Sequence, residues 1–177
     1  MIIRENVPIS ELVTMRIGGN ARYVFELESM ERSELIDAQF IHCDFSNMNF
    51  DDSHIYRSRF KNCKFLAASL YHSFMKDTHF EACMMSLANL SSIKMENVSF
   101  QDCMMEDVSF IEVKHKKLSF DNVQMEHISF QDTPLKGIDL STSHFYNFTY
   151  SPHLLRGLTL SSIQGENLLV SLGLKIK

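Results

Sequence analysis

The chain has 177 residues, of which 45% are hydrophobic, and its formal net charge is −5 at pH 7. This length is enough for one domain with a substantial core, and the hydrophobic content excludes a disordered chain. The acidic balance argues against general binding to nucleic acid or to an anionic membrane.

The N-terminal segment, residues 1–32, contains no repeat and lacks the apolar region of a signal peptide. No apolar run in the sequence approaches the roughly 20 residues of a membrane span. We therefore expect a cytoplasmic protein whose four cysteines stay reduced.

Residues 6–29, NVPISELVTMRIGGNARYVFELES, resemble the opening segment of UDP-N-acetylenolpyruvoylglucosamine reductase, a flavoenzyme of cell-wall synthesis. The most specific part of this resemblance is TMRIGG at residues 14–19. Nothing after Ser33 resembles the rest of that enzyme, so its flavin site and catalytic residues are missing. We expect a recruited fragment without enzyme activity, with residues 22–28 as a strand that covers the start of the next segment.

From residue 33 to residue 150 the sequence repeats every five residues. A column of large apolar residues begins at Leu35 and continues to Tyr150, with His115 as its polar exception. Two residues before each of these lies a second column, which is mostly small and becomes mostly β-branched from Val98 onward. The other three positions are mostly polar. Neither a helix nor a strand has a period of five, so the pattern indicates a solenoid.

The simplest geometry turns the chain through a right angle every five residues, so that four sides close one coil. The spacing of the only cysteines, which recur every twenty residues, supports four sides rather than three; they are Cys43, Cys63, Cys83 and Cys103. About six coils stacked roughly 4.8 Å apart would form a rod on the order of 30 Å long. This pattern resembles the pentapeptide-repeat family, which implies an all-β fold, the right-handed quadrilateral β-helix.

Residues twenty apart stack, so each side of the coil can be read as a ladder. We name the four sides face 1, face 2, face 3 and face 4, centred on Phe40, Phe45, Phe50 and Ile55 in the first full coil. The predicted core ladder of face 1 is Phe40, Phe60, Phe80, Phe100 and Phe120.

The cysteines are the small inward residues of face 2, where we expect buried fillers. Their parallel side chains point the same way and cannot converge on a metal ion. On face 4 we expect the coil to bulge at His115 and let its ring reach solvent.

The outward residues predict a polarised rod. Three faces are acidic, and their candidate partner-binding residues are Asp44, Asp51, Asp52, Glu81, Asp102, Glu106, Asp107, Glu112, Asp121, Glu126, Asp132 and Asp139. Face 4 is basic, with Arg57, Lys76, Lys94, Lys114, Lys116, Lys117 and Lys136 against Asp77 and Glu96. The acidic faces suit a basic groove; the other interpretation is a solubilised surface with chance sorting.

Apolar residues at outward positions predict a contact surface. They are Leu66, Met84, Leu87 and Met104 on face 2 and Phe74 on face 4.

After residue 150 the repeat dissolves. Ser161 or Ser162 can cap a helix that runs to about Leu172, Gly173 suits its end, and the final LKIK could add an edge strand. Such a segment either caps the open end of the solenoid or joins two copies in a symmetric dimer. The candidate dimer residues are Leu154, Leu155, Leu158, Leu168, Leu169, Leu172 and Leu174.

The same tail resembles the C-terminus of the quinolone-resistance pentapeptide proteins of the Qnr and MfpA type. The resemblance rests on Leu160, Gln164, Leu168 and the Leu172–Gly173–Leu174 run. It implies a head-to-head dimer through the C-terminal region and a rod that mimics duplex DNA. Such a rod binds DNA gyrase and topoisomerase IV and protects them from fluoroquinolones.

This rod is short and lacks the loops that many such proteins insert between coils. The alternative function is a pentapeptide-repeat interaction scaffold with another protein partner. We expect no catalytic residue, cofactor, metal or small-molecule substrate, because no nucleophile–base pair, metal spacing or phosphate loop appears.

Overall fold

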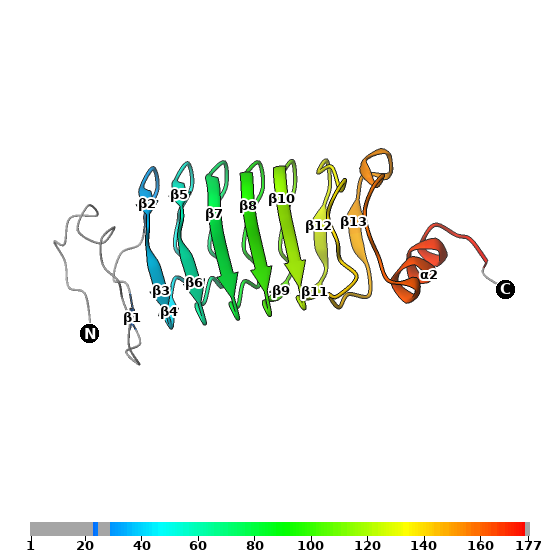
Figure 1. Ribbon diagram of the computed structural model, residues 1–177, viewed down its shortest axis with the longest axis horizontal. Coiled ribbons are helices and arrows are strands. Elements are labelled where there is room, and N and C mark those ends of the chain that lie inside the picture. Colours follow the sequence, from blue (N-terminus) through cyan, green and yellow to red (C-terminus); the bar gives the residue numbers. More distant parts are fainter. Residues whose placement is uncertain (1–22, 25–28, 176–177) are drawn as a thin grey trace.

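The computed structural model describes residues 23–24 and 29–175, and every structural statement below refers to these. They form a parallel β-solenoid whose coils stack along one axis, followed by a single short helix (Figure 1). No helix in this part of the chain is long and apolar enough to cross a membrane.

The strands follow the sides of the coils. They are β1 (Tyr23–Val24), β2 (Glu34–Ile36), β3 (Gln39–Ile41), β4 (Cys43–Asp44), β5 (His54–Tyr56), β6 (Arg59–Lys61), β7 (Phe74–Glu81), β8 (Lys94–Gln101), β9 (Met104–Glu106), β10 (Lys114–Asp121), β11 (Gln124–Glu126), β12 (Ile128–Phe130) and β13 (Phe148–Tyr150). A 3-10 helix, η1 (Pro152–Leu154), and an α-helix, α2 (Ser162–Ser171), follow them.

All strand pairs are parallel and join residues twenty apart. In the largest sheet, ordered β10-β8-β7-β5-β2, Met75 pairs with Met95 and Phe80 with Phe100. On face 2, β11 pairs with β9, which places Met125 beside Met105. This register confirms the twenty-residue coil with four sides.

The corners depend on a left-handed backbone. From Arg32 to Asp132, every fifth residue has a φ between 47° and 62°, which gives twenty-one non-glycine residues in this conformation. Thirteen of these are Asn, Asp or His, the residues that tolerate the left-handed region best. Part of the polar character of the corners is therefore a requirement of the turn.

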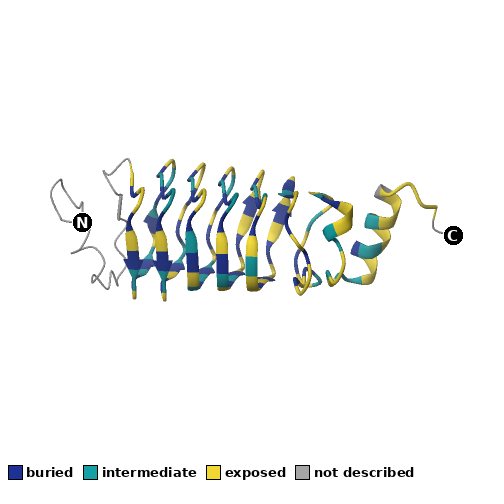
Figure 2. Cartoon of the chain, turned by 90° about the horizontal axis from the view of Figure 1, so that it is seen from above, coloured by how far each residue is buried: buried dark blue, intermediate teal, exposed yellow. Residues whose placement is uncertain are grey.

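The core is a set of stacked rings. Along face 1, successive rings from Phe40 to Phe120 lie 4.9–5.4 Å apart and within 9–16° of parallel. Neighbouring faces meet edge to face, as where Phe40 contacts Phe45 at 5.2 Å and 86°. Buried and exposed residues alternate along each side of the rod (Figure 2). The predicted phenyl ladder is thus confirmed.

The small inward residues also bind the backbone. The hydroxyl of Ser73 donates to the carbonyl of Phe50, 23 residues earlier, at 2.7 Å. The thiol of Cys63 does the same to Phe40 at 3.5 Å, and that of Cys103 to Phe80 at 3.6 Å. All four cysteines are free and buried. A thiol here replaces a hydroxyl as a small donor in the same column.

We expect all four cysteines to resist alkylation in the native protein. Hydrogen bonds between neighbouring thiols raise the pKa of Cys43 and Cys83 and lower the pKa of Cys63 and Cys103. All four thiols are at most 1% exposed, so a reagent in solvent cannot reach any of them. Mass spectrometry after iodoacetamide treatment should find the modification only when urea is present. Modification of the native protein within minutes would contradict this packing.

On face 4, the predicted bulge at His115 is wrong, and the predicted exposure of Phe74 is only partial. The coil does not bulge at His115, because β10 pairs with β8 through the register His115 to Met95. The ring is half-buried and its Nε2 contacts the carbonyl of Pro134 in the next coil. Phe74 is only half-exposed: the rings of His54 and Tyr56 meet it edge to face at 6.3 and 5.5 Å, and the Lys94 ammonium lies 4.7 Å from its ring centroid.

The coils reach beyond the predicted N-terminal boundary. Ser29 forms a parallel bridge with Asn49, and Met30 is buried in the core cluster. β1 falls within the segment predicted as a strand and pairs with β4. The remainder of the reductase-like segment, including residues 14–19, lies outside the described residues.

The coils also continue past residue 150. The Leu135 amide donates to the carbonyl of Leu154 at 2.9 Å, and the Leu140 amide donates to that of Thr159 at 3.0 Å. Leu160 packs against the core at the end of this turn. Leu155 and Leu160 continue the column of large residues through this turn, but His153 and Leu158 replace the small residues that precede them in a regular repeat.

The predicted C-terminal helix is confirmed as α2. Ser161 is its N-cap and forms a capping box with Gln164, and Gly173 ends it with a φ of +81°. The Gln164 side chain also donates to the carbonyls of Leu140 and Ser143 at 2.9 and 2.7 Å. This buried amide fastens the helix to the last coil. The predicted edge strand is absent at Leu174, and residues 176–177 lie outside the described residues.

Candidate protein-interaction surface

The predicted acidic residues occupy the outer sides of faces 1, 2 and 3, but they are not equivalent along the rod. In the N-terminal half they are half-buried and engaged within the coil surface: Lys61 Nζ lies 2.5 Å from Glu81 Oε1. Asp52 contacts His72 Nδ1 at 2.6 Å. Asp44 accepts from the Ser46 hydroxyl at 2.6 Å. Asp51 accepts from the Tyr71 amide at 2.9 Å.

Cations offset these carboxylates. Between residues 39 and 100, three basic residues lie on the same faces as the four predicted acids: Arg59, Lys61 and Lys64. This half of the rod is therefore close to neutral on faces 1–3.

The C-terminal half differs. Eight acidic residues, all exposed, surround faces 1–3 between residues 101 and 140, and we call them the acidic collar: Asp102, Glu106, Asp107, Glu112, Asp121, Glu126, Asp132 and Asp139. These faces carry no Lys or Arg in this range, which the structure describes throughout.

The collar carboxylates contact neutral donors or histidine. Asn122 donates to Asp102 at 2.7 Å, and the Ser92 hydroxyl donates to Glu112 at 2.9 Å. The amide and hydroxyl of Ser141 lower the pKa of Asp139.

The charge density of the collar is comparable with that of DNA. Two coils span about 10 Å, so eight carboxylates give roughly one charge per 1.2 Å, against about 1.7 Å in duplex DNA. On its basic side the same pair of coils carries Lys114, Lys116, Lys117 and Lys136. The C-terminal half is thus strongly polarised across its axis.

Face 4 is less uniformly basic than predicted. Glu34 and Asp37 also lie on it, near the N-terminal end. The Arg57 guanidinium bonds Asp37 at 2.6 and 2.8 Å and lowers the pKa of that carboxyl. The Lys94 ammonium lies 2.9 Å from the Glu96 carboxylate and lowers the pKa of Glu96 in the same way. The excess of positive charge therefore also lies toward the C-terminal half.

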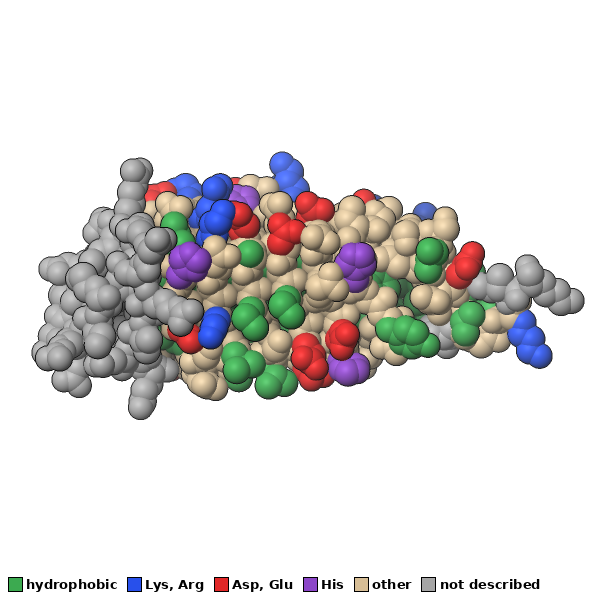
Figure 3. Space-filling model, turned by 90° about the horizontal axis from the view of Figure 1, so that it is seen from below, with side chains coloured by type: hydrophobic (Ala, Val, Ile, Leu, Met, Phe, Trp, Pro, Cys, Tyr) green, Lys and Arg blue, Asp and Glu red, His purple; other side chains and the backbone are tan. Residues whose placement is uncertain are grey.

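The predicted apolar residues of face 2 are exposed, which confirms their outward position. The exposed fractions are 46% for Leu66, 46% for Met84, 55% for Leu87 and 53% for Met104. We call these four the methionine patch. Figure 3 shows hydrophobic side chains on this side of the rod, directly beside acidic ones. The patch therefore borders the collar.

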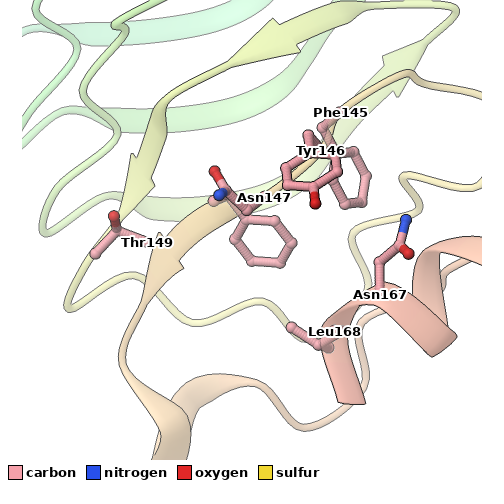
Figure 4. A pocket seen from close by; sticks show the side chains of 7 residues that line it. Phe145, Tyr146, Asn147, Thr149, Asn167 and Leu168 are labelled. Carbon is pink, nitrogen blue, oxygen red and sulfur yellow. The ribbon is translucent and has the colours of Figure 1, made fainter. Parts of the chain in front are cut away.

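A pocket of about 270 Å³ lies between the last coil and α2 (Figure 4). Phe145, Asn167 and Leu168 are among its lining residues, and Tyr146 at its edge is 83% exposed.

The candidate dimer residues divide into two groups. Leu155 and Leu158 pack against the core of their own chain, and Leu154 and Leu168 are half-buried. The exposed ones are Leu169, Leu172 and Leu174. Sequence reasoning missed Ile163 and Val170, which are 72% and 60% exposed on the same helix. Both are apolar residues in the predicted terminal helix, and that feature could have identified them as candidate dimer residues.

One group of side chains could approach a cation. Among the described residues, the ligand atoms of Glu106, Asp107 and His127 lie within 4.8 Å of one another. All three are exposed, and His127 Nδ1 already lies 3.3 Å from Asp107. They form part of the collar surface.

Four-sided, twenty-residue coils define this molecule as a right-handed quadrilateral β-helix. Residues 33–110 match the family model described as the pentapeptide repeat region. This part of the chain is a pentapeptide-repeat solenoid.

Similar solved structures include full-length QnrB1, a plasmid-mediated fluoroquinolone resistance protein, with 16% identity, a TM-score of 0.42 and coverage of 88% of this chain and 89% of that chain. Another is a pentapeptide repeat protein from the thylakoid lumen of Arabidopsis thaliana, with 18% identity, a TM-score of 0.37 and coverage of 62% and 66%. No curated protein matches the sequence.

Proposed function

We propose that this protein is a non-catalytic mimic of duplex DNA that binds the type II topoisomerases DNA gyrase and topoisomerase IV in the cytoplasm. By occupying their DNA-binding groove it would protect them from fluoroquinolones. The observation that carries the proposal is the acidic collar, which presents eight exposed carboxylates without a compensating cation on three sides of a rod.

Charge density and direction both support this function. A groove built to hold DNA is basic, and the collar offers a DNA-like number of negative charges per unit length. The lysines on face 4 would be repelled by the same groove. Complementary fields fix the orientation of a complex, so face 4 should point outward and faces 1–3 inward. The resemblance of the C-terminal tail to the quinolone-resistance proteins points to the same partner.

The first test is a gyrase supercoiling assay with and without ciprofloxacin. We expect micromolar protein to relieve the inhibition by ciprofloxacin, or to inhibit supercoiling when it is in excess, because it competes with DNA for the groove. Bovine serum albumin at the same concentration controls for nonspecific effects. If the protein changes neither supercoiling nor its inhibition, the proposal fails.

We further propose a homodimer through the C-terminal region. The outer side of α2 presents apolar residues that a second copy could cover, and the pocket beside Tyr146 could accept one of its side chains. The collar lies in the coils before this end. A symmetric dimer would therefore bring two collars toward its centre and lengthen the DNA-like surface.

Replacing Leu169 and Val170 with Asp should convert this dimer to a monomer without unfolding the rod, because both side chains are exposed. Light scattering after gel filtration measures the mass, and circular dichroism measures the fold. The control is Glu166→Gln on the same helix, which should remain a dimer. A monomeric unmodified protein at tens of micromolar would contradict the dimer.

A second candidate function, an interaction scaffold with a different protein partner, is favoured by the methionine patch. Duplex DNA offers no array of exposed apolar side chains, so a mimic of DNA does not need one. Unchanged gyrase activity together with a monomeric rod would favour this scaffold.

A further inference from the structure

The methionine patch is not required by the coil. Bridges and strand pairs connect Lys64, Met84, Met104 and Gln124 in one outward column of face 2. Lys and Gln occupy that column at the two ends of the patch and are exposed as well. The fold therefore accepts polar residues there, and the two methionines need another explanation.

Leu87 is also costly to the fold. It occupies a corner with a φ of 62°, a conformation that is unfavourable for a bulky residue. In the same corner column, other coils place Asn47, Asp107 and His127, which tolerate this backbone better. Leu87 is 55% exposed, so burial within the chain does not offset its strain. Strain that a fold does not need often accompanies a binding surface.

The charges around the patch indicate its partner. Glu106, Asp107 and Glu126 lie at its C-terminal side, and Lys64 lies at its N-terminal side. Carboxylates at that position repel nucleic acid and anionic lipid. They attract Lys and Arg, and the exposed methionine and leucine side chains attract apolar groups. Methionine adapts its shape to different apolar surfaces.

We infer that face 2, from Lys64 to His127, docks an amphipathic basic segment of a partner protein. Its apolar side chains would cover Met84, Leu87 and Met104, and its Lys or Arg residues would pair with the adjacent acids of the collar. This inference goes beyond the mimicry of DNA, because the outer surface of duplex DNA has no row of flexible apolar side chains. It applies whichever protein carries the segment.

A synthetic amphipathic helix of Leu and Lys is a suitable probe, and the methyl groups of the methionines report its position by NMR. We expect the probe to shift the methyl signals of Met84 and Met104. Met85 and Met105 follow them directly in the sequence but are fully buried, so their signals should stay nearly unchanged. A peptide of Ser and Lys with the same charge should produce much smaller shifts.

The variant Met84→Gln/Met104→Gln tests the apolar contact, since Gln124 occupies the same column. It should weaken binding of the Leu–Lys probe at least about tenfold. Leu87→Asn should also weaken binding, while the fold becomes no less stable because Asn suits this corner. The matched control is Tyr71→Ser, which removes a side chain of 45% exposure from face 3 and should leave binding unchanged.

Equal binding of the two peptides, or of the methionine variant and the parent protein, would overturn the inference. Gyrase assays on the same proteins separate the two proposals. Binding of the Leu–Lys probe at the patch without any effect on gyrase would leave docking intact and remove the topoisomerase proposal. Protection of gyrase by a protein that does not bind the Leu–Lys probe at the patch would leave the topoisomerase proposal intact and remove the docking inference.

Discussion

Replacing Phe80 with Ala should lower the free energy of unfolding by about 4 kcal/mol, because it opens a large cavity in the core. The ring is 1% exposed. It stacks on Phe60 and on Phe100 at 4.9 Å and meets Phe65 edge to face at 5.6 Å. The variant therefore loses both its own burial and contacts with three other rings. Urea unfolding followed by circular dichroism measures the change.

Phe80→Leu is the control, since Leu140 occupies the same column three coils toward the C-terminus. It should cost roughly 1–2 kcal/mol, because part of the volume remains filled. Since each coil contacts only its neighbours, the alanine variant should also unfold less cooperatively. A loss below about 1 kcal/mol for Phe80→Ala would mean that the ladder is not continuous.

Neutralising the acidic collar should have the largest effect on function. The fourfold variant Asp102→Asn, Glu106→Gln, Asp107→Asn and Glu126→Gln removes four charges with little change in shape. Asn suits the corner positions of residues 102 and 107, because other corners already carry it. Binding to gyrase should weaken about tenfold or more, and its dependence on salt concentration should become shallower.

The chain offers a control of equal charge. Glu34→Gln, Asp37→Asn, Asp77→Asn and Glu96→Gln also remove four carboxylates, but from face 4 and its corner. This control should bind gyrase as well as the parent protein, or better. If both variants lose the same affinity, net charge rather than the collar determines binding. Biolayer interferometry over a series of salt concentrations provides both the affinity and its salt dependence.

The solenoid could be predicted from the sequence because each inward position has the same surroundings in every coil. The same type of residue therefore recurs there at a fixed interval. The column from Leu35 to Tyr150 reflects that repetition. The ends could not be predicted as well. Met30, Leu155 and Leu160 continue the column of large residues, but the small column is lost beside them, at Glu28, His153 and Leu158.

The candidate surface was only partly predictable. A count of the charged residues on each face does not show the contrast between the two halves of the rod, because the count combines both halves. The hydrogen bonds that occupy Asp44 and Asp51 depend on neighbours two to twenty residues away. The buried amide of Gln164 determines which side of α2 packs on the rod. The five-residue repeat does not extend to this residue, so the repeat could not predict the contact.

The twenty-residue coil also determines which insertions and deletions keep the faces of the rod aligned. Inserting twenty residues lengthens the rod by one coil, deleting twenty shortens it by one coil, and either change leaves every face in line. Inserting or deleting five residues preserves the core column but turns all later coils by a quarter of a revolution. A change of five residues near residue 100 would carry the collar and Met104 around the axis, away from Leu66, Met84 and Leu87. Natural variation in the length of this rod should therefore occur in steps of whole coils.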